Sequence, residues 1–450
     1  MRQHSNQLTL NAVGQQSHSL NDYDWTFANA DTQYLTHGIH KYPARMPPQL
    51  PAGLFSHFKS TGEVSDGDTV YDPFSGSGTT ATEARLRGIN AIANDINPFA
   101  VELSKAKSTP LDLDKLDAAM EALLGNLQTR FRNVRAAVDR GEDVLPPELA
   151  AEAKQVSTDW FPEPQLTQLF IVRERLDSLA DQFSRDIIRF LRIGLAKCAR
   201  KVSYQRQGEF KRYRLAPADR TDHNPNVFNE IMTVLRDNRQ RMRSFLNVAD
   251  PSIHTRIEQA DSRNSLEHPS LGLEENCADI IITSPPYGDH QTTVAYGEFS
   301  TNLSTLAFGE SYDRMVDVDK RGLGGINVER TLSGLRADSE SLHSVIEDLK
   351  SVEGRSKDAL EFFIDFNSVI ETIGKIIKPG QPVAWVVANR RMSDVWIPTH
   401  EIVRELCETA GYTTRAVLPR LIKDKTLPHS NRAGDTMTEE YIVVASGPEL

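Results

Sequence analysis

Two short stretches of the chain hold residue types that could do chemistry together. The first reads Asp-Pro-Phe-Ser-Gly-Ser-Gly-Thr-Thr over residues 72–80 and follows a short apolar run that predicts a strand. Gly76 and Gly78 allow the backbone to approach a ligand closely, and open α/β sheets bind ligands at the carboxyl ends of their strands. The stretch is not a P-loop, since no Lys follows it, and it is not a full dinucleotide fingerprint. A tight turn without a ligand is the alternative interpretation.

An acid at the end of the next predicted strand favours a nucleoside ligand. Residues 89–94 predict this second strand, and Asp95 follows at the position where a carboxylate can accept hydrogen bonds from ribose hydroxyls. Asn97-Pro98 then opens a predicted helix that continues through Lys107. This order of strand, loop, helix, strand, acid and helix is typical of a doubly wound parallel sheet.

The second stretch is Ser-Pro-Pro-Tyr at 284–287, which follows a predicted buried strand. The two prolines remove backbone donors and fix φ, so the carbonyls around them are rigidly oriented. Ser284 adds a hydroxyl acceptor, and Tyr287 adds a flat ring that can stack on a base. Two such acceptors can hold the N–H hydrogens of an exocyclic amine while its lone pair points outward. The alternative is a rigid strand exit with a core tyrosine.

These two stretches together resemble the motifs of the amino-group DNA methyltransferases, which use S-adenosylmethionine. Three further segments are similar to motifs of the same family: 37–46 to motif ten, 94–98 to motif two, and 260–262 to motif three. The resemblance covers most of residues 34–108 and 255–446, and the order of its motifs is that of the family's gamma arrangement.

The resemblance implies an α/β fold, namely a Rossmann-like class I methyltransferase sheet with a large helical insertion, and S-adenosyl-L-methionine as the cofactor. It assigns catalysis to Ser284, Pro285, Pro286 and Tyr287. The positions that it assigns to cofactor binding are Tyr42, Pro43, Asp72, Phe74, Gly76, Gly78, Thr79, Thr80, Asp95, Asn97, Asp261 and Ser262. Phe74 fits a role in the core almost as well.

The form of the catalytic motif indicates which amine is methylated. The family mostly uses Ser-Pro-Pro-Tyr for cytosine N4 and Asp-Pro-Pro-Tyr for adenine N6, so we expect cytosine-N4 methylation of double-stranded DNA. Ser284 and the Pro285 carbonyl would hold the amine with its lone pair in line with the sulfonium methyl group. The target base must leave the duplex and would stack on Tyr287. We expect a restriction-modification or other bacterial defence system, with a cognate restriction endonuclease as a candidate partner.

Four other interpretations compete with this one. Adenine-N6 methylation of DNA is the nearest, whereas RNA guanine-N2 methylation usually has Asp or Asn before the two prolines. Cytosine-C5 methylation needs a nucleophilic Cys, usually after a Pro, but Cys198, Cys277 and Cys407 follow Lys, Asn and Leu. A non-catalytic, cofactor-binding partner subunit would be expected to lose one motif, yet both motifs are intact.

Changes in composition and hydrophobic periodicity divide the chain into several parts. Residues 1–33 are rich in Gln, Asn, Ser and His and predict a flexible N-terminal arm. Residues 34–110 and 251–450 form the predicted catalytic domain, and helical periods over 111–250 predict an insertion that is a candidate target-recognition region. Gly-Leu-Gly-Gly and many charges make 311–355 a candidate mobile loop.

The net charge of −11, from 51 Lys and Arg against 62 Asp and Glu, argues against DNA binding by an overall positive field. DNA contacts must then come from local basic clusters, and one such cluster with interleaved tyrosines spans 197–214. A solvated helix end is the alternative for this cluster. The candidate DNA-binding residues are Arg200, Lys201, Arg206, Lys211, Arg212, Arg214, Arg390 and Arg391.

Composition also indicates the cellular location of the protein and whether it binds a metal. The three cysteines are far apart and odd in number, so we expect no disulfide framework and a cytoplasmic location. No stretch nears the roughly 20 apolar residues that a membrane span needs, and the polar first residues lack the apolar segment of a secretory signal. His37 and His40 have a metal-ligand spacing without a further ligand nearby, so we expect no metal.

Overall fold

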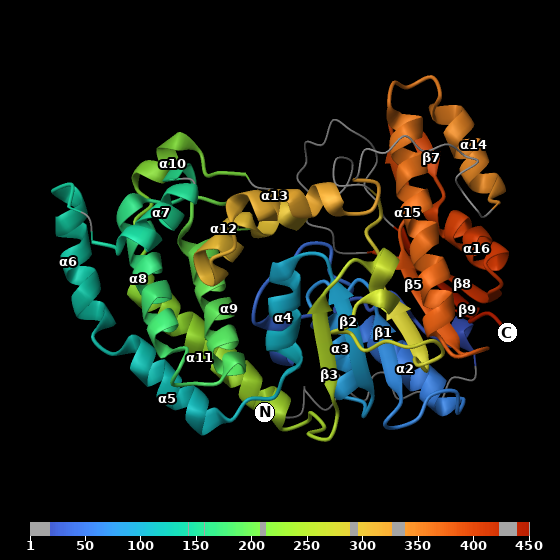
Figure 1. The fold of residues 1–450 in the computed structure, drawn as a ribbon, viewed down its shortest axis with the longest axis horizontal. Coiled ribbons are helices and arrows are strands. Elements are labelled where there is room, and N and C mark those ends of the chain that lie inside the picture. Colours follow the sequence, from blue (N-terminus) through green and yellow to red (C-terminus); the bar gives the residue numbers. More distant parts are fainter. Residues whose placement is uncertain are drawn as a thin grey trace.

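The computed structural model describes residues 19–142, 144–156, 158–207, 213–288, 296–325, 338–422 and 439–449. Its centre is a seven-stranded sheet in the order β3-β2-β1-β4-β5-β9-β8 (Figure 1). The strands are β1 (Thr69–Asp72), β2 (Asn90–Asp95), β3 (Thr255–Gln259), β4 (Ile280–Thr283), β5 (Pro382–Val387), β8 (Thr413–Leu421) and β9 (Glu439–Ser446). β9 runs antiparallel to β5 and β8, and the other pairs are parallel. The predicted Rossmann-like sheet is therefore confirmed.

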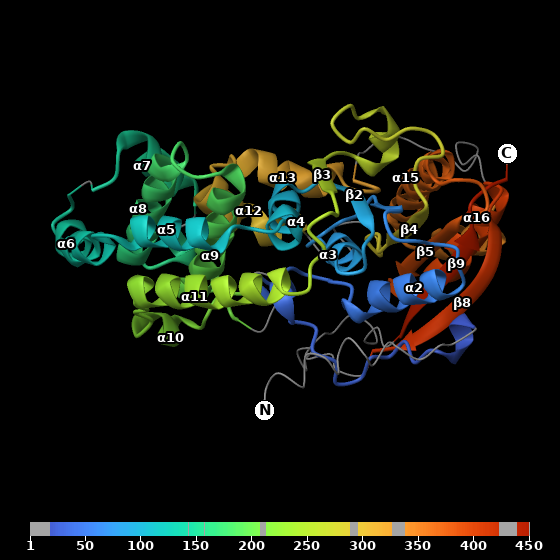
Figure 2. The same cartoon turned by 90° about the horizontal axis from the view of Figure 1, so that it is seen from below.

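The central strands of the sheet lie between two layers of helices (Figure 2). β4 and β5 are buried along their whole length, and such continuous apolar runs are typical of parallel strands that are covered on both faces. Neighbouring residues of β1 face opposite layers: Val70 packs with α2 (Gln49–Ser60) and α3 (Thr79–Arg85), whereas Tyr71 packs with α15 (Arg355–Ile376). α16 (Thr399–Thr409) contributes to the second layer.

The carboxyl ends of β1, β2 and β4 lie at one edge of the sheet. Asp72 is in register with Ala93 of β2, and Tyr71 is in register with Ile281 of β4. The strand order changes direction between β1 and β4, which is the usual ligand site of open α/β sheets. Since the loops after β1 and β4 carry the two chemically suggestive stretches, the fold brings these stretches together.

The large helical insertion is confirmed as part of this fold. Its helices are α5 (Leu113–Leu124), α6 (Leu127–Asp139), α7 (Pro147–Gln155), α8 (Glu163–Leu179), α9 (Arg185–Val202), α10 (Pro217–Thr221) and α11 (Val227–Leu246). All of them except α10 share one hydrophobic core with α4 (Pro98–Ser108) and α12 (Tyr296–Phe308), and the insertion extends the molecule beyond β3 (Figure 1). The role of this insertion in target recognition remains a prediction.

The described part of the predicted mobile loop at 311–355 is largely helical, and its mobility remains a prediction. It holds α13 (Tyr312–Arg321) and α14 (Glu340–Leu349), while residues 326–337 lie outside the described part of the chain. Both helices have a serine N-cap: Ser311 accepts a hydrogen bond from the Arg314 amide, and Ser339 accepts one from the Leu342 amide. Capping and the burial of one face outweigh the charged composition of the segment.

Within the predicted flexible arm at 1–33, the structure describes the residues from Ser19 onward, and these pack against α2. Trp25 is only 4% exposed, and its ring lies against Gly53 of α2, where a Cβ would come within 3.0 Å of the indole. The indole N–H donates to the Leu20 carbonyl at 2.9 Å. Burial of this aromatic side chain fixes the segment, which the polar composition did not predict.

No helix among the described residues is long and apolar enough to cross a membrane. Those same residues contain no cluster of three or more His, Cys, Asp or Glu side chains arranged to hold a metal ion.

Candidate active site

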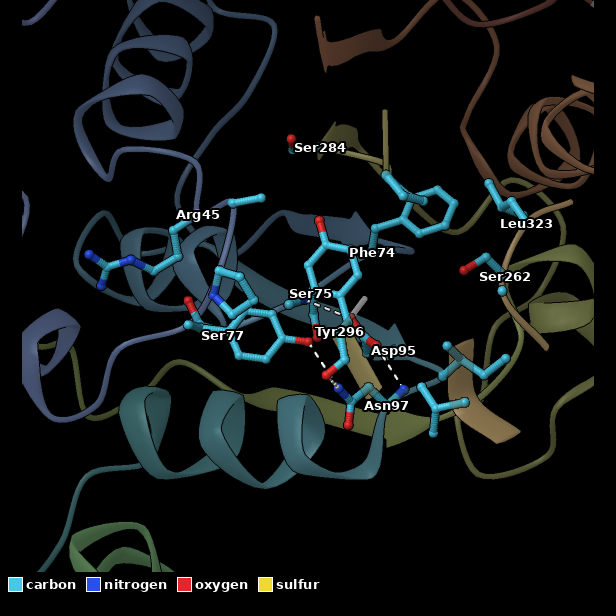
Figure 3. A pocket seen from close by; sticks show the side chains of 18 of the residues that line it. Arg45, Phe74, Ser75, Ser77, Asp95, Asn97, Ser262, Ser284, Tyr296 and Leu323 are labelled. Atoms are coloured by element: carbon cyan, nitrogen blue, oxygen red, sulfur yellow. Dashed lines mark hydrogen bonds between the residues drawn. The ribbon is translucent and has the colours of Figure 1, made fainter. Parts of the chain in front are cut away.

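A cavity of about 1050 Å³, counting its open mouth, lies at the carboxyl ends of β1, β2 and β4. Every predicted cofactor position except Gly78 lines it, and so do Ser284 and Pro286 of the predicted catalytic motif. Figure 3 shows Ser284 on one side of the cavity, with Asp95 and Asn97 on the other. The fold therefore joins motifs that are about 200 residues apart in the chain.

The glycine-rich loop after β1 uses its two glycines for different purposes. Gly76 has a φ of +48° and lines the cavity, where its amide donates to Asp95 Oδ2 at 2.9 Å. Gly78 has a φ of +78° and caps α3, and a Cβ there would lie 2.4 Å from Ser104 Oγ of α4. Gly78 thus permits the close packing of α3 on α4 rather than the approach of a ligand.

Asp95 lies half-buried at the end of β2 and faces the cavity. Besides the Gly76 amide, the Asn97 amide donates to its Oδ1 at 2.8 Å, so both carboxylate oxygens are fixed in orientation. Burial raises the pKa of Asp95 to about 6. Each oxygen keeps a further lone pair for a ligand hydroxyl.

Asp72 at the end of β1 lines the cavity and also holds neighbouring segments together. It is 3% exposed, and its Oδ1 accepts hydrogen bonds from the Phe74 amide at 3.1 Å and from Thr283 Oγ1 at 2.7 Å. Burial raises its pKa to about 6. Because Thr283 precedes Ser284, this bond ties the glycine-rich loop directly to the catalytic motif.

Asn97 and Tyr42 form part of the cavity wall. The Asn97 side chain caps α4 by accepting from the Phe99 amide at 3.0 Å, and its Nδ2 donates to Ser300 Oγ at 2.9 Å and to the Tyr42 hydroxyl at 3.2 Å. The Tyr42 and Tyr296 rings stack with their centroids 5.8 Å apart. Most of the polar capacity of Asn97 is therefore used to hold the wall together.

Asp261 lines the cavity while its carboxylate is held by Arg263, whose Nε donates to Oδ1 at 2.9 Å. Arg263 also reaches Asp365 Oδ2 of α15 at 2.8 Å and the Arg321 carbonyl at 3.0 Å. Ser262, the other predicted residue here, donates to the Pro73 carbonyl. This network attaches the C-terminal end of α13 to the edge of the cavity.

Several lining residues were not predicted from the sequence. The hydroxyl oxygens of Ser75 and Ser77 are buried in the cavity wall, and among the described residues neither has a hydrogen-bond partner. Buried polar groups are almost always satisfied, so these two hydroxyls fit a polar ligand such as a nucleoside cofactor. The remaining unpredicted lining residues on α12, α13 and the segment after it are Tyr296, Val318, Asp319, Arg321, Gly322 and Leu323.

The Ser-Pro-Pro-Tyr motif is held by contacts with β5 and β9, the next two strands of the sheet after β4. Ser284 Oγ donates to the Val386 carbonyl of β5 at 3.1 Å, which turns the lone pairs of the oxygen away from β5. The Tyr287 hydroxyl donates to Glu440 Oε1 of β9 at 3.1 Å, and Glu440 is also paired with Arg420 of β8. Burial, followed by the Glu440 charge, raises the pKa of Tyr287 well above its usual value. Pro285 is buried behind the lining.

The predicted DNA-binding residues have several different environments. Arg200 is 5% exposed with its guanidinium 4.9 Å from the Phe299 ring centroid, and Arg390 is also 5% exposed. These two side chains pack against neighbouring elements and are largely shielded from solvent, and their predicted role in DNA binding remains a prediction. The exposed or partly exposed candidates within the described residues are Lys201, Arg206, Arg214 and Arg391, while Lys211 and Arg212 lie outside those residues.

Two of the exposed candidates form ion pairs with acidic side chains. Lys201 pairs with Glu230 at 3.1 Å, and Arg214 pairs with Asp159 at 3.4 Å. Such exposed ion pairs are worth little on their own, so a phosphate can replace the carboxylate at small cost.

The sheet order, the glycine-rich loop, the acid after β2 and the Ser-Pro-Pro-Tyr motif after β4 together define a Rossmann-like methyltransferase. A family model, N6_N4_Mtase, described as DNA methylase, matches residues 3–106. The Type II methyltransferase M.MvaI of Kocuria varians is 31% identical over 439 residues, covering 93% of this chain and 92% of that relative. The chain therefore belongs to the amino-group DNA methyltransferase family, which confirms the resemblance.

A second relative, with lower sequence identity, is also named a Type II methyltransferase. The Type II methyltransferase M.BsoBI of Geobacillus stearothermophilus is 22% identical over 437 residues, covering 85% of this chain and 80% of that relative. Among solved structures, the rRNA methyltransferase aviRa from Streptomyces viridochromogenes matches with a TM-score of 0.31 and 12% identity, over 95% of this chain and 96% of that one. Membership of the family implies a DNA substrate and a methyl donor of the S-adenosylmethionine type.

Proposed function

We propose that this protein transfers a methyl group from S-adenosyl-L-methionine to the exocyclic N4 of cytosine in duplex DNA. The observation that carries the proposal is the position of Ser284, whose hydroxyl lies 3.1 Å from the Val386 carbonyl and which lines the same cavity as Asp95. The relatives are named Type II methyltransferases, so we further propose a restriction-modification system with a cognate endonuclease as partner.

The cofactor would lie along the glycine-rich loop. Asp95 would accept hydrogen bonds from the ribose hydroxyls, Asp261 would meet the adenine amine, and the hydroxyls of Ser75 and Ser77 would gain the partners that they lack among the described residues. The remaining predicted positions, apart from Gly78, would complete the contact surface. S-adenosylmethionine, when bound, supplies an activated methyl group.

The catalytic motif would position the amine. The oxygen of Ser284 accepts one N–H of the amine, and the Pro285 carbonyl accepts the other, so the nitrogen lone pair is directed into the cavity. The two prolines keep both acceptors fixed, which means that little reorganisation is needed during the reaction. The Tyr287 ring, held by Glu440, offers a surface on which the extruded base can stack.

The helical insertion is the proposed site of target recognition. Residues 111–250 contain 23 Lys and Arg against 21 Asp and Glu, a slight positive excess in a chain whose net charge is −11. Positive charge is thus concentrated in the insertion, and phosphate contacts supply most of the sequence-independent affinity for DNA. Lys201, Arg206 and Arg214 are the described residues that we propose for such contacts.

Incubation with methyl-labelled S-adenosylmethionine and duplex DNA, followed by digestion to nucleosides, tests the proposal. We expect the label in N4-methylcytosine. Label in N6-methyladenine would establish the alternative adenine activity. Absence of label in every nucleoside, under conditions where calorimetry shows that the cofactor binds, would leave only a non-catalytic partner subunit.

We also expect cofactor affinity to fall as the pH drops through about 6. Since the pKa of Asp95 is raised to about 6, its carboxylate is ionised at pH 8 and gains a proton as the pH falls through that value. The protonated acid is a poorer acceptor for ribose hydroxyls. Titration calorimetry with S-adenosylmethionine between pH 5 and pH 8 measures the effect.

The Asp95→Asn variant provides the control for this titration. It should bind the cofactor roughly tenfold or more weakly at pH 8, as expected for loss of a charged acceptor, and its affinity should vary less with pH. If the variant keeps the pH dependence of the parent, another group is responsible, and Asp72, whose pKa is also raised to about 6, becomes the first candidate.

A further inference from the structure

A two-stranded hairpin follows β5 directly and is separate from the central sheet. It consists of β6 (Arg390–Met392) and β7 (Val395–Ile397), with Arg391 paired to Trp396 across the strands. The turn residues Ser393 and Asp394 have φ angles of +48° and +69°, as the tight two-residue turns of hairpins require. Because side chains alternate along strands, the hairpin has an inner face and an outer face.

The inner face attaches the hairpin to the catalytic motif. Arg390, Met392 and Ile397 are all buried. The Arg390 guanidinium lies so close to Gly288 that a Cβ on this glycine would be 2.3 Å from Arg390 Cζ. Gly288 immediately follows Ser-Pro-Pro-Tyr and lines the cavity with Ser284. The position of the hairpin is therefore fixed relative to the site of the target base.

The outer face presents an aromatic ring and a cation to solvent. Trp396 is 51% exposed, which is the highest value among the large exposed hydrophobic residues of the described chain. The Arg391 guanidinium lies 5.7 Å from the centroid of its indole, and Arg391 is exposed as well. Arg391 also donates to the Asp394 carbonyl at 3.2 Å, so the side chain is held over the ring.

We propose that this outer face, Arg391 with Trp396, contacts the DNA next to the extruded target nucleotide. The inference rests on the proposed function, since it requires duplex DNA with its target base in the cavity. Extrusion leaves neighbouring bases unstacked, and an exposed indole beside the site can stack on one of them. The guanidinium contacts the adjacent phosphate, for which its charge is complementary.

A purely structural role would have different consequences. The cross-strand pair of Arg391 and Trp396 also stabilises the hairpin, so loss of either side chain can lower the melting temperature. A structural role does not, however, predict a change in DNA affinity that depends on salt, nor a response of the indole to DNA. The experiment therefore measures DNA binding and thermal stability on the same variants.

The first test compares Trp396→Ala and Trp396→Phe on a duplex that the parent protein methylates. We expect Trp396→Ala to weaken DNA binding, measured by fluorescence anisotropy, by about tenfold or more, as for loss of one base–aromatic stack. Trp396→Phe should retain most of the affinity, and both variants should bind S-adenosylmethionine as the parent does. Lys375→Ala changes an exposed side chain outside the helical insertion, near the C-terminal end of α15, and should change DNA affinity by less than twofold.

The second test isolates the charge. Arg391→Ala should reduce the slope of log Kd against log salt by about one unit, as for loss of one phosphate contact, and Arg391→Lys should keep the slope. Lys375→Ala removes an exposed charge near the C-terminal end of α15, at the opposite edge of the sheet, and should leave the slope unchanged.

The outcomes separate this inference from the proposed function. If Trp396→Ala and Arg391→Ala melt like the parent and bind DNA within twofold of it, with the parental salt slope, the hairpin does not contact DNA. Such a result leaves cytosine methylation by the parent untouched. If the parent itself neither binds nor methylates duplex DNA, the proposed function fails and the hairpin inference fails with it.

Discussion

Ser284→Ala is expected to lower kcat by about 10²–10³-fold while leaving the affinity for S-adenosylmethionine unchanged. Loss of one preorganised hydrogen-bonding group that acts in the transition state typically has an effect of this size. Ser284 lines the cavity, and its hydroxyl contacts the Val386 carbonyl and the Tyr287 hydroxyl, neither of which is a predicted cofactor position. Removal of the hydroxyl should therefore leave the cofactor contacts at Asp95 intact.

Single-turnover methyl transfer and titration calorimetry measure the two quantities separately. Ser368→Ala is a matched control, since the Ser368 hydroxyl in α15 also donates to a backbone carbonyl, that of Ile364, but lies away from the cavity lining. We expect this control to retain the parental kcat. Parental turnover by Ser284→Ala would show that another group holds the amine. Loss of cofactor binding by Ser284→Ala, together with normal binding by Asp95→Asn, would reverse the assigned roles.

The parts of this site that local chemistry determines could be predicted from the sequence. Asp72 and Asp95 follow buried strands, and parallel strands place their carboxyl ends at one edge, so their proximity follows from the order of elements. Asn97 was predicted to open a helix because it precedes a proline, and it caps α4. In each case the signal lies within a few residues of the feature that it predicts.

The rest of the site depends on contacts between distant segments, which leave no local pattern. Arg263 bridges Asp261 to Asp365, which is 102 residues further along the chain, and it also holds the C-terminal end of α13 at the cavity. Asp319 accepts hydrogen bonds from the amides of Gly297 and Glu298, so α13 caps the start of α12. The i, i+3 spacing of the buried pair Met315 and Val318 was the available sign of a helix, but the charged composition obscured it.

The burial of two predicted DNA-binding arginines also depends on contacts between distant segments. The basic character of Arg200 and Arg390 suggested contact with phosphate, but both side chains pack their guanidinium groups against aromatic rings, those of Phe299 and Phe362. Arginine combines a permanent charge with a flat surface that stacks well, so its type alone does not distinguish a DNA contact from a packed position.

Tyr287→Ala is expected to lower kcat/KM for DNA by about 5- to 150-fold, as for loss of one aromatic stack on a base, with little change in cofactor affinity. The hydroxyl of this tyrosine donates to Glu440 Oε1 at 3.1 Å, and Glu440 is paired with Arg420, whose Nε donates to the Trp25 carbonyl at 2.8 Å. The ring is thus fixed through β9 and β8 to the N-terminal segment. Glu440 is a positioning residue in this chain of contacts.

A double-mutant cycle tests whether Glu440 acts through Tyr287. Tyr287→Phe keeps the stacking surface and loses only the hydrogen bond, so we expect an effect on kcat/KM smaller than that of Tyr287→Ala. Glu440→Gln should have an effect similar to that of Tyr287→Phe, and the double variant should be no worse than the poorer single variant, because both changes break one interaction. Additive effects would mean that Glu440 contributes by another route, such as its pairing with Arg420.

The pH dependence provides an independent check on the same pair. The raised pKa of Tyr287 keeps its hydroxyl protonated throughout the neutral and mildly alkaline range, so the bond to Glu440 persists there. We therefore expect the ratio of parental to Tyr287→Phe kcat/KM to stay constant between pH 7 and pH 9. A ratio that falls toward one as the pH rises would show that the Tyr287 hydroxyl ionises in this range and that it is not held as a donor to Glu440.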